Sequence, residues 1–241
     1  MSENYSDTPR HGITKETPKN ILLNAATIHA GLSCGTHYKV TNDTTPSSGT
    51  EYYTKTGSDY TKFTGSTFVQ GNTYYVKYTG WNFAETIIGA TQGGTKISIK
   101  PEIKDIEVDG ALVKVKGLAV KMGETASIET TYAEVTAKNI ASALVGSITH
   151  TQTSGFKGDV ISPKKHIEEG DYISGFGVVG YRTDGRPLAV IFDYALCTSG
   201  FETETKNKEA AVVKATFECY ADIGSGCDTL PYKIYDFDEE Q

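Results

Sequence analysis

The sequence contains few of the residues that metal centres, disulfide frameworks and membrane helices require. Among its 241 residues are four cysteines, two methionines and one tryptophan. Cys34, Cys197, Cys219 and Cys227 form no C-x-x-C pair and have no histidine at metal-binding spacing. We therefore expect free, mostly buried thiols, with a disulfide as the alternative, and no metal site.

Long apolar runs are also missing. No stretch of about 18 apolar residues is present, so no membrane-spanning helix is expected. The first 20 residues are polar and lack the apolar segment of a signal peptide, which predicts folding in a cytoplasm. Positive charge is scarce as well, because 23 Lys and Arg face 30 Asp and Glu, a net charge of −7. Tight nucleic-acid binding needs cations that neutralise phosphates, so this chain is a poor candidate for it.

Catalytic motifs are present in fragments but without the context they need. Residues 31–35 match the G-x-S-x-G hydrolase motif around Ser33, which requires a strand before it and a helix after it. A Thr/Tyr-rich stretch follows instead, although a Ser33 hydrolase stays as an alternative. Residues 89–96 resemble a phosphate-binding loop, but a strand-like run follows where a helix should begin. We interpret the carboxylate cluster 168–171 as a solvated turn, and we predict no catalytic residue and no cofactor.

What the chain does contain favours strands and turns. It has 25 glycines and 15 tyrosines, and its length suffices for one large β domain or two small ones. Apolar and polar residues nearly alternate on both sides of Asp109-Gly110, a dipeptide that tolerates tight hairpin turns. A second paired run is expected over 117–122 and 125–135, interrupted by Gly123. The sequence therefore predicts a long hairpin in this region.

After residue 135 the spacing of apolar residues changes from that of a strand to that of a helix, which predicts one short helix. Thr136 can cap its start. Ala137, Ile140, Ala141, Leu144 and Val145 then fall on one face, and Gly146 is placed to end the helix in the left-handed conformation.

The remaining segments complete a mainly β chain. Residues 147–163 are interpreted as a loop or weak strands. Further strands are predicted by apolar patterns at 21–32, 96–100, 171–179, 187–197 and 210–221. A helix stays possible for 21–32. We expect eight or more strands in a β-sandwich or partly closed barrel, with one flanking helix.

The composition changes sharply between residues 35 and 80. This segment has no Leu or Ile but holds 7 of the 15 tyrosines. We predict a small β insertion on the outer surface, with little core of its own, within a main domain of residues 20–34 and 81–241. Residues 1–19 are polar and form either a disordered tail or an arm that orders against a neighbouring subunit.

Taken together, the segments resemble the tail-tube (major tail) proteins of long-tailed bacteriophages and prophages of Gram-positive hosts. The resemblance covers nearly all of 19–32 and 81–235, whereas 35–80 has no counterpart in it. It is carried by the order and spacing of KNILLN (19–24), IHA (28–30), WNFAE (81–85), IGAT (88–91), PEI (101–103), IEVDGA (106–111), VKGL (115–118), GET (123–125), EEGDY (168–172), ALCTSG (195–200), TFEC (216–219) and LPYK (230–233).

The resemblance implies a structural virion protein rather than an enzyme. Six copies would form a ring, and stacked rings would form the tail tube, assembled in the host cytoplasm. Its partners would be copies of itself, the tape-measure protein, and the tail terminator and distal tail or baseplate proteins. DNA would pass through the bore during ejection, and an acidic bore would repel its phosphates. No membrane partner and no cofactor are implied.

Exposed strand edges fit this expectation, because copies of the chain can complete one another's sheets. The long hairpin is the candidate for contacts between subunits. Its candidate residues are Ile106, Val108, Asp109, Gly110, Leu112 and Val113. Two alternatives stay open: a tube subunit of a related secretion or injection apparatus, and a glycan-binding β module acting through 35–80.

Overall fold

The computed structural model describes residues 17–110, 112–204, 207, 211–225 and 228–238. The chain divides into two compact units, which are described separately. The larger unit contains the described residues up to Ala30 and from Ile88 onward, and the smaller unit spans Gly31–Ile87. The predicted insertion 35–80 lies within the smaller unit. Most of the predicted arm 1–19 lies outside the described residues, and Thr17–Lys19 form a short 3-10 helix.

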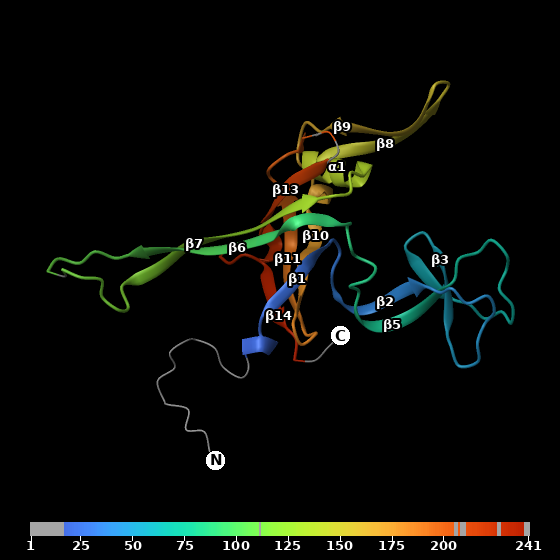
Figure 1. The fold of residues 1–241 in the computed structure, drawn as a ribbon, viewed down its shortest axis with the longest axis horizontal. Coiled ribbons are helices and arrows are strands. Elements are labelled where there is room, and N and C mark those ends of the chain that lie inside the picture. The colour runs from blue at the N-terminus through green and yellow to red at the C-terminus, as the bar shows by residue number, and fades with distance from the viewer. Residues whose placement is uncertain (1–16, 111, 205–206, 208–210, 226–227, 239–241) are drawn as a thin grey trace, which may run out of the picture. The chain divides into compact units, whose positions relative to one another are not determined.

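The larger unit is built on one antiparallel sheet (Figure 1). Its hydrogen-bonded order is β1 (Leu22–His29), β10 (Ile173–Arg182), β11 (Pro187–Cys197), β13 (Val212–Cys219), β7 (Ala119–Tyr132) and β6 (Thr91–Asp105). Two further strands pair at its sides, β12 (Glu202–Glu204) with β13 and β14 (Tyr232–Asp236) with β11. The predicted mainly β class is confirmed. Among the described strands, this order does not close into a barrel.

The core of the larger unit follows the alternation that the sequence predicts for half-buried strands. In β13, every second residue from Val213 to Cys219 is buried. The Phe217 ring lies 4.2 Å from the Phe176 ring of β10, centroid to centroid. Ile28 and Ile128, from β1 and β7, join the same cluster. Strands far apart in the sequence are therefore held together by one apolar layer.

The described cysteines are free thiols. Cys197 and Cys219 are buried as predicted, whereas Cys34 is exposed, and Cys227 lies outside the described residues. Burial, reinforced by Asp193, raises the pKa of the Cys219 thiol to about 12, so it stays protonated at neutral pH. A protonated, buried thiol is chemically inert and serves as a small apolar side chain.

Helix α1 (Ala137–Leu144) begins as predicted but ends differently. The Thr136 side chain accepts a hydrogen bond of 3.2 Å from the backbone N–H of Asn139. The left-handed residue is Val145, with φ of 51°, and the prediction for Gly146 was wrong. Gly146 instead opens a strand, where a Cβ atom would lie 3.0 Å from the Ser162 carbonyl oxygen. Glycine is needed there for close approach of two strands, not for a positive φ.

The buried face of the helix also differs from the predicted one. Asn139, Ala141 and Ala143 are buried, whereas Leu144 is 44 % exposed. The Asn139 side chain donates a hydrogen bond of 3.2 Å to the Glu134 carbonyl oxygen, which satisfies a polar group at this buried position. Ala141 is thus buried as predicted, whereas Ile140 is half-buried and Leu144 is exposed.

Residues 146–163 form a hairpin of β8 (Gly146–Thr153) and β9 (Phe156–Pro163). The sequence left this segment as a loop or weak strands. The hairpin is a separate two-stranded sheet, and Ile148, Phe156 and Val160 are exposed on it. With little apolar surface to bury, its strands lack the alternating pattern that identifies a half-buried strand.

The smaller unit is a four-stranded sheet in the order β2 (Cys34–Val40), β5 (Tyr75–Trp81), β3 (Tyr52–Thr56) and β4 (Asp59–Lys62). Its interior is aromatic. The Phe68 and Tyr74 rings stack with centroids 4.1 Å apart, and Tyr52 meets Phe68 edge to face at 4.9 Å. Tyr52 and Tyr74 are buried. Within 35–80 these two are the only buried apolar side chains, so the core of this segment is small, as expected, and aromatic rings supply it.

A substitution at Phe217 tests the core of the larger unit. We expect Phe217→Ala to lower the free energy of unfolding by about 3–5 kcal/mol, because it removes a fully buried ring and leaves a cavity. The measurement is a denaturant titration followed by circular dichroism. Phe156→Ala, which removes the same ring from a half-exposed position, is the matched control. Equal losses for the two variants would contradict this placement of the core.

Candidate assembly surface

β6 and β7 form one long hairpin where the sequence predicted pairing around Asp109-Gly110 and a second paired run over 117–122 and 125–135. β6 and β7 pair from Thr91 opposite Tyr132 to Asp105 opposite Ala119, and Figure 1 shows them side by side. At Gly123, opposite Glu102, the register of the pairing shifts as the next pair joins Ile103 to Lys121, although β7 continues as one strand. Asp109-Gly110 does form a turn, but within the longer connection from β6 to β7 rather than directly between the last paired residues, Asp105 and Ala119. We call the described residues of this connection, 106–110 and 112–118, the tip loop.

Half of this hairpin extends past the sheet that supports it. β13 pairs with β7 between Ser127 and Tyr132. From residue 126 down to Ala119, β7 is paired with β6, and in the described part of the chain no third strand joins either outer edge. We call this two-stranded part, residues 99–105 and 119–126, the ribbon. Eight residues of strand span about 25 Å. Two-stranded ribbons are marginally stable alone, and unpaired edges are ready to pair with another chain.

The tip loop at the end of the ribbon is apolar and exposed. Leu112 is 98 % exposed and Val113 is 78 % exposed. The loop is closed by a hydrogen bond of 2.8 Å from the Ile106 N–H to the Leu118 carbonyl oxygen. All six candidate interface residues lie in this loop and are exposed: Ile106, Val108, Asp109, Gly110, Leu112 and Val113. The structure thus brings together the residues that the sequence selected, and whether they contact another subunit stays a prediction.

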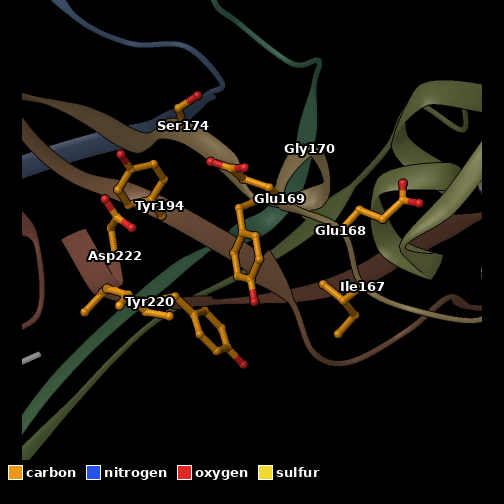
Figure 2. A pocket seen from close by; sticks show the side chains of 11 residues that line it. Ile167, Glu168, Glu169, Gly170, Ser174, Tyr194, Tyr220 and Asp222 are labelled. Atoms are coloured by element: carbon orange, nitrogen blue, oxygen red, sulfur yellow. The ribbon is translucent and has the colours of Figure 1, made fainter. Parts of the chain in front are cut away.

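A pocket of about 650 Å³ is the second candidate feature of the larger unit (Figure 2). Its aromatic walls are Tyr172, Tyr194 and Tyr220, and the Tyr172 and Tyr220 rings meet at 5.5 Å between centroids. Tyr194 lies in β11, whereas Tyr172 directly precedes β10 and Tyr220 directly follows β13. We call this the tyrosine pocket. Its tyrosines are distant in the sequence and share no local pattern, so no sequence signal indicates this pocket.

Carboxylates surround the tyrosine pocket. Glu168, Glu169 and Asp222 line it together with the apolar side chains of Ile167 and Ile223. Figure 2 shows Glu168 and Glu169 at one side and Asp222 near Tyr194 at the other. A cavity with tyrosine rings and several carboxylates has the chemistry that attracts a cation attached to an apolar group.

The cluster predicted as a solvated turn has a defined structure beside this pocket. Glu169–Asp171 form the 3-10 helix η2, and the Glu168 N–H donates a hydrogen bond of 2.8 Å to the Asp171 carboxylate. Lys164 Nζ lies 2.7 Å from Asp171 Oδ1 and 2.9 Å from Glu168 Oε2. The hydrogen bond from Lys164 holds the pKa of Asp171 below its usual value. Lys164 therefore anchors the segment that forms one wall of the pocket.

The motif fragments of the sequence lie in different surroundings from those that their chemistry requires. Ser33 is followed at once by β2, not by a helix, and its N–H donates a hydrogen bond of 2.8 Å to Asn82 Oδ1. The end of the stretch that resembles a phosphate loop lies within β6, again without a helix. Over the described residues, no group of three or more His, Cys, Asp or Glu side chains could hold a metal ion. Within the same residues, no helix is long and apolar enough to span a membrane.

Comparison with known proteins does not assign the chain to a family. No protein-family model matches the sequence, and a search among curated proteins finds no match. Function therefore has to follow from the chemistry of the ribbon, the tip loop and the pockets.

The ion pair between Lys164 and Asp171 beside the tyrosine pocket leads to a prediction about pH. We expect Lys164→Met to raise the pKa of Asp171 toward the ordinary aspartate value of about 3.9, because the stabilising cation is removed. A lowered native pKa stabilises the fold above the unfolded-state pKa, and this contribution is lost as the pH falls through the native pKa. The variant should therefore have a lower free energy of unfolding than the wild type at neutral pH. On acidification, its free energy of unfolding should fall by less.

The measurement is an NMR titration of the Asp171 carboxyl carbon. Lys165→Met removes a neighbouring exposed lysine and should leave that titration unchanged. An unchanged Asp171 titration in Lys164→Met would show that the ion pair does not set its pKa.

Proposed function

We propose that this protein is a tail-tube subunit of a bacteriophage or prophage particle. In this proposal six copies close into a ring, and the rings stack around a tape-measure protein to form a tube for DNA. The observation that carries the proposal is the ribbon: two strands that extend beyond their sheet, with unpaired edges and an exposed apolar tip. The resemblance in the sequence supports the same conclusion independently of this geometry.

In a protein that stays monomeric, the ribbon would leave an apolar tip and unpaired strand edges exposed to water. Its apolar tip exposes Leu112 and Val113 to water, and exposed apolar clusters mark interaction sites. Its outer edges offer N–H and C=O groups that another strand can pair with. Contacts with neighbouring copies would cover both features at once. A heterologous contact of this kind closes into rings or continues as a tube.

The net charge of −7 per chain agrees with a conduit for DNA. In a tube whose inner surface shares this sign, the phosphates would be repelled and the DNA would slide instead of binding. A tube subunit of a related secretion or injection apparatus would have the same ribbon. A tape-measure gene beside the gene for this protein would favour the phage assignment.

The smaller unit supports a second function, which can coexist with the first. Residues opposite one another in its sheet share a face, and by this register Tyr38, Tyr53, Tyr60 and Tyr75 lie together. Tyr38 and Tyr60 stack with ring centroids 3.9 Å apart. The same face carries Lys55, Lys62 and Lys77. We call it the tyrosine–lysine face.

A groove of about 590 Å³ borders this face and is lined by hydroxyl and amide groups beside Lys55 and Tyr75. Its polar side chains are those of Thr54, Thr56, Asn72 and Thr73. Aromatic rings next to hydroxyl and amide groups suit a sugar ring, and the lysines favour one that carries negative charge. The second candidate function is therefore binding of an acidic glycan through the smaller unit.

The tube proposal predicts self-assembly that depends on the tip loop. We expect the purified protein to form rings or tubes by electron microscopy, and the double substitution Leu112→Asp and Val113→Asp to prevent it. Each lost apolar contact removes about 1.5–3 kcal/mol, which weakens association at least about tenfold. Sedimentation velocity measures the assembled fraction.

Val69→Asp alters an exposed apolar residue of the smaller unit and should leave assembly intact. A wild-type protein that stays monomeric at high concentration would overturn the proposal. Normal assembly of the tip variant would show that assembly does not depend on the tip loop.

The glycan proposal is tested by charge reversal on the tyrosine–lysine face. The double substitution Lys55→Glu and Lys77→Glu should abolish binding to acidic polysaccharides on a glycan array, because it replaces attraction by repulsion. Lys39→Glu reverses a lysine that the register places on the opposite face and should retain binding. The proposal would be contradicted if the wild type bound no glycan. It would also be contradicted if the wild type, the double variant and Lys39→Glu all bound neutral glycans equally well.

A further inference from the structure

The tyrosine pocket gathers aromatic rings from the ends of three strands. The Tyr172 and Tyr220 rings meet edge to face, with an angle of 67° between their planes. An edge-to-face contact covers at most one face of one ring, so this pair leaves ring surface for a third group. Tyr194 lies opposite Ser174 in the register of β10 and β11, so both side chains project from one face of the sheet. Three rings thus line one cavity of about 650 Å³, a volume typical of small-molecule sites.

The charge on these walls is negative. Among the described residues that line the pocket, three are acidic and none is Lys, Arg or His. Glu168 is held by Lys164 at 2.9 Å, and Asp222 already accepts a hydrogen bond of 3.3 Å from the Gly224 N–H. Glu169 differs from both, because its carboxylate takes part in no ion pair within the part of the chain that the structure describes. Glu169 is therefore the carboxylate that can balance a positive charge on a ligand.

These walls discriminate among classes of ligand. An anion would meet no basic side chain in the described lining. A metal ion needs several converging ligand atoms, and over the described residues no group of three or more His, Cys, Asp or Glu side chains could supply them. A bulky cation covered by carbon is attracted by the faces of aromatic rings. The exposed side chains of Ile167 and Ile223 add apolar surface for its carbon groups.

From these features we infer that the tyrosine pocket binds an organic quaternary ammonium ion. The ring faces of Tyr172, Tyr194 and Tyr220 contact the N-methyl groups, and Glu169 balances the charge without having to accept a hydrogen bond. A primary ammonium group fits less well, because it needs acceptors for three N–H donors and only one carboxylate is left for it. This binding function goes beyond the proposed tube and does not depend on self-assembly.

Choline and its neutral analogue 3,3-dimethyl-1-butanol test the inference. The two molecules have nearly the same shape, and only choline carries the positive charge. We expect choline to bind the wild type at least about tenfold more tightly, because only the cation is attracted by the ring faces. Ligand-observed saturation-transfer NMR measures both affinities, and it works for weak ligands and for a monomer or an assembly alike. The N-methyl protons should receive more saturation than the protons beside the choline hydroxyl group.

Substitutions in the pocket locate the binding site. Tyr220→Leu keeps an apolar side chain but removes the ring, so choline should bind about tenfold more weakly while the neutral analogue changes little. Glu169→Gln removes the balancing charge and should weaken choline binding by about two- to fivefold. The matched control is Tyr181→Leu, which removes an exposed tyrosine of β10 outside the pocket and should leave choline binding unchanged. Circular dichroism verifies that each variant is folded.

Four results would overturn the inference. The first is a folded wild type that binds no choline. The second is equal affinity for choline and the neutral analogue, which would make the pocket merely apolar. The third is choline binding that survives Tyr220→Leu, and the fourth is an equal loss in Tyr181→Leu. None of these results bears on the tube proposal, which electron microscopy tests separately, and a protein that forms no tube can still bind choline.

Discussion

The register between β13 and β7 is the constraint on which the larger unit depends. The pairing runs from Val213 opposite Tyr132 to Glu218 opposite Ser127 and then stops, because β13 ends. Up to this point Phe217 and Ile128 are buried in the common core. Beyond it, β6 and β7 continue for several residues with no third strand paired to either of them among the described strands, and the ribbon is the result. An assembly role for the protein is proposed because such a ribbon gains stability when a neighbour covers it.

The two units bury their cores by different chemistry. The larger unit uses Ile, Val, Ala and Phe side chains from distant strands, and Ala143 of helix α1 joins the same cluster. The smaller unit has no Leu or Ile across 35–80, and rings such as Phe68 and Tyr74 stack instead. Aromatic packing leaves polar hydroxyl groups at the ring tips. A sheet built this way can present a tyrosine–lysine face to a ligand while remaining folded.

Charged residues are unevenly distributed over the surface of the larger unit. The acidic residues that outnumber the basic ones are not spread evenly, since Glu168, Glu169 and Asp222 gather at one pocket. The lysines of residues 112–118 lie about 25 Å of ribbon away from it.

The sequence by itself determined the strand-rich class, the long strands after residues 170 and 186, and the start of the helix at Thr136. These features follow from local patterns, namely alternation along a strand and a side chain that caps a helix. It also placed the turn at Asp109-Gly110 and the exposed candidates around it. The length of the hairpin, the role of Gly146 and the tyrosine pocket were decided by the tertiary structure alone. Each of them depends on pairing between segments distant in the chain, such as Gly146 with Pro163 or Tyr194 with Tyr220, and a local pattern carries no information about such pairs.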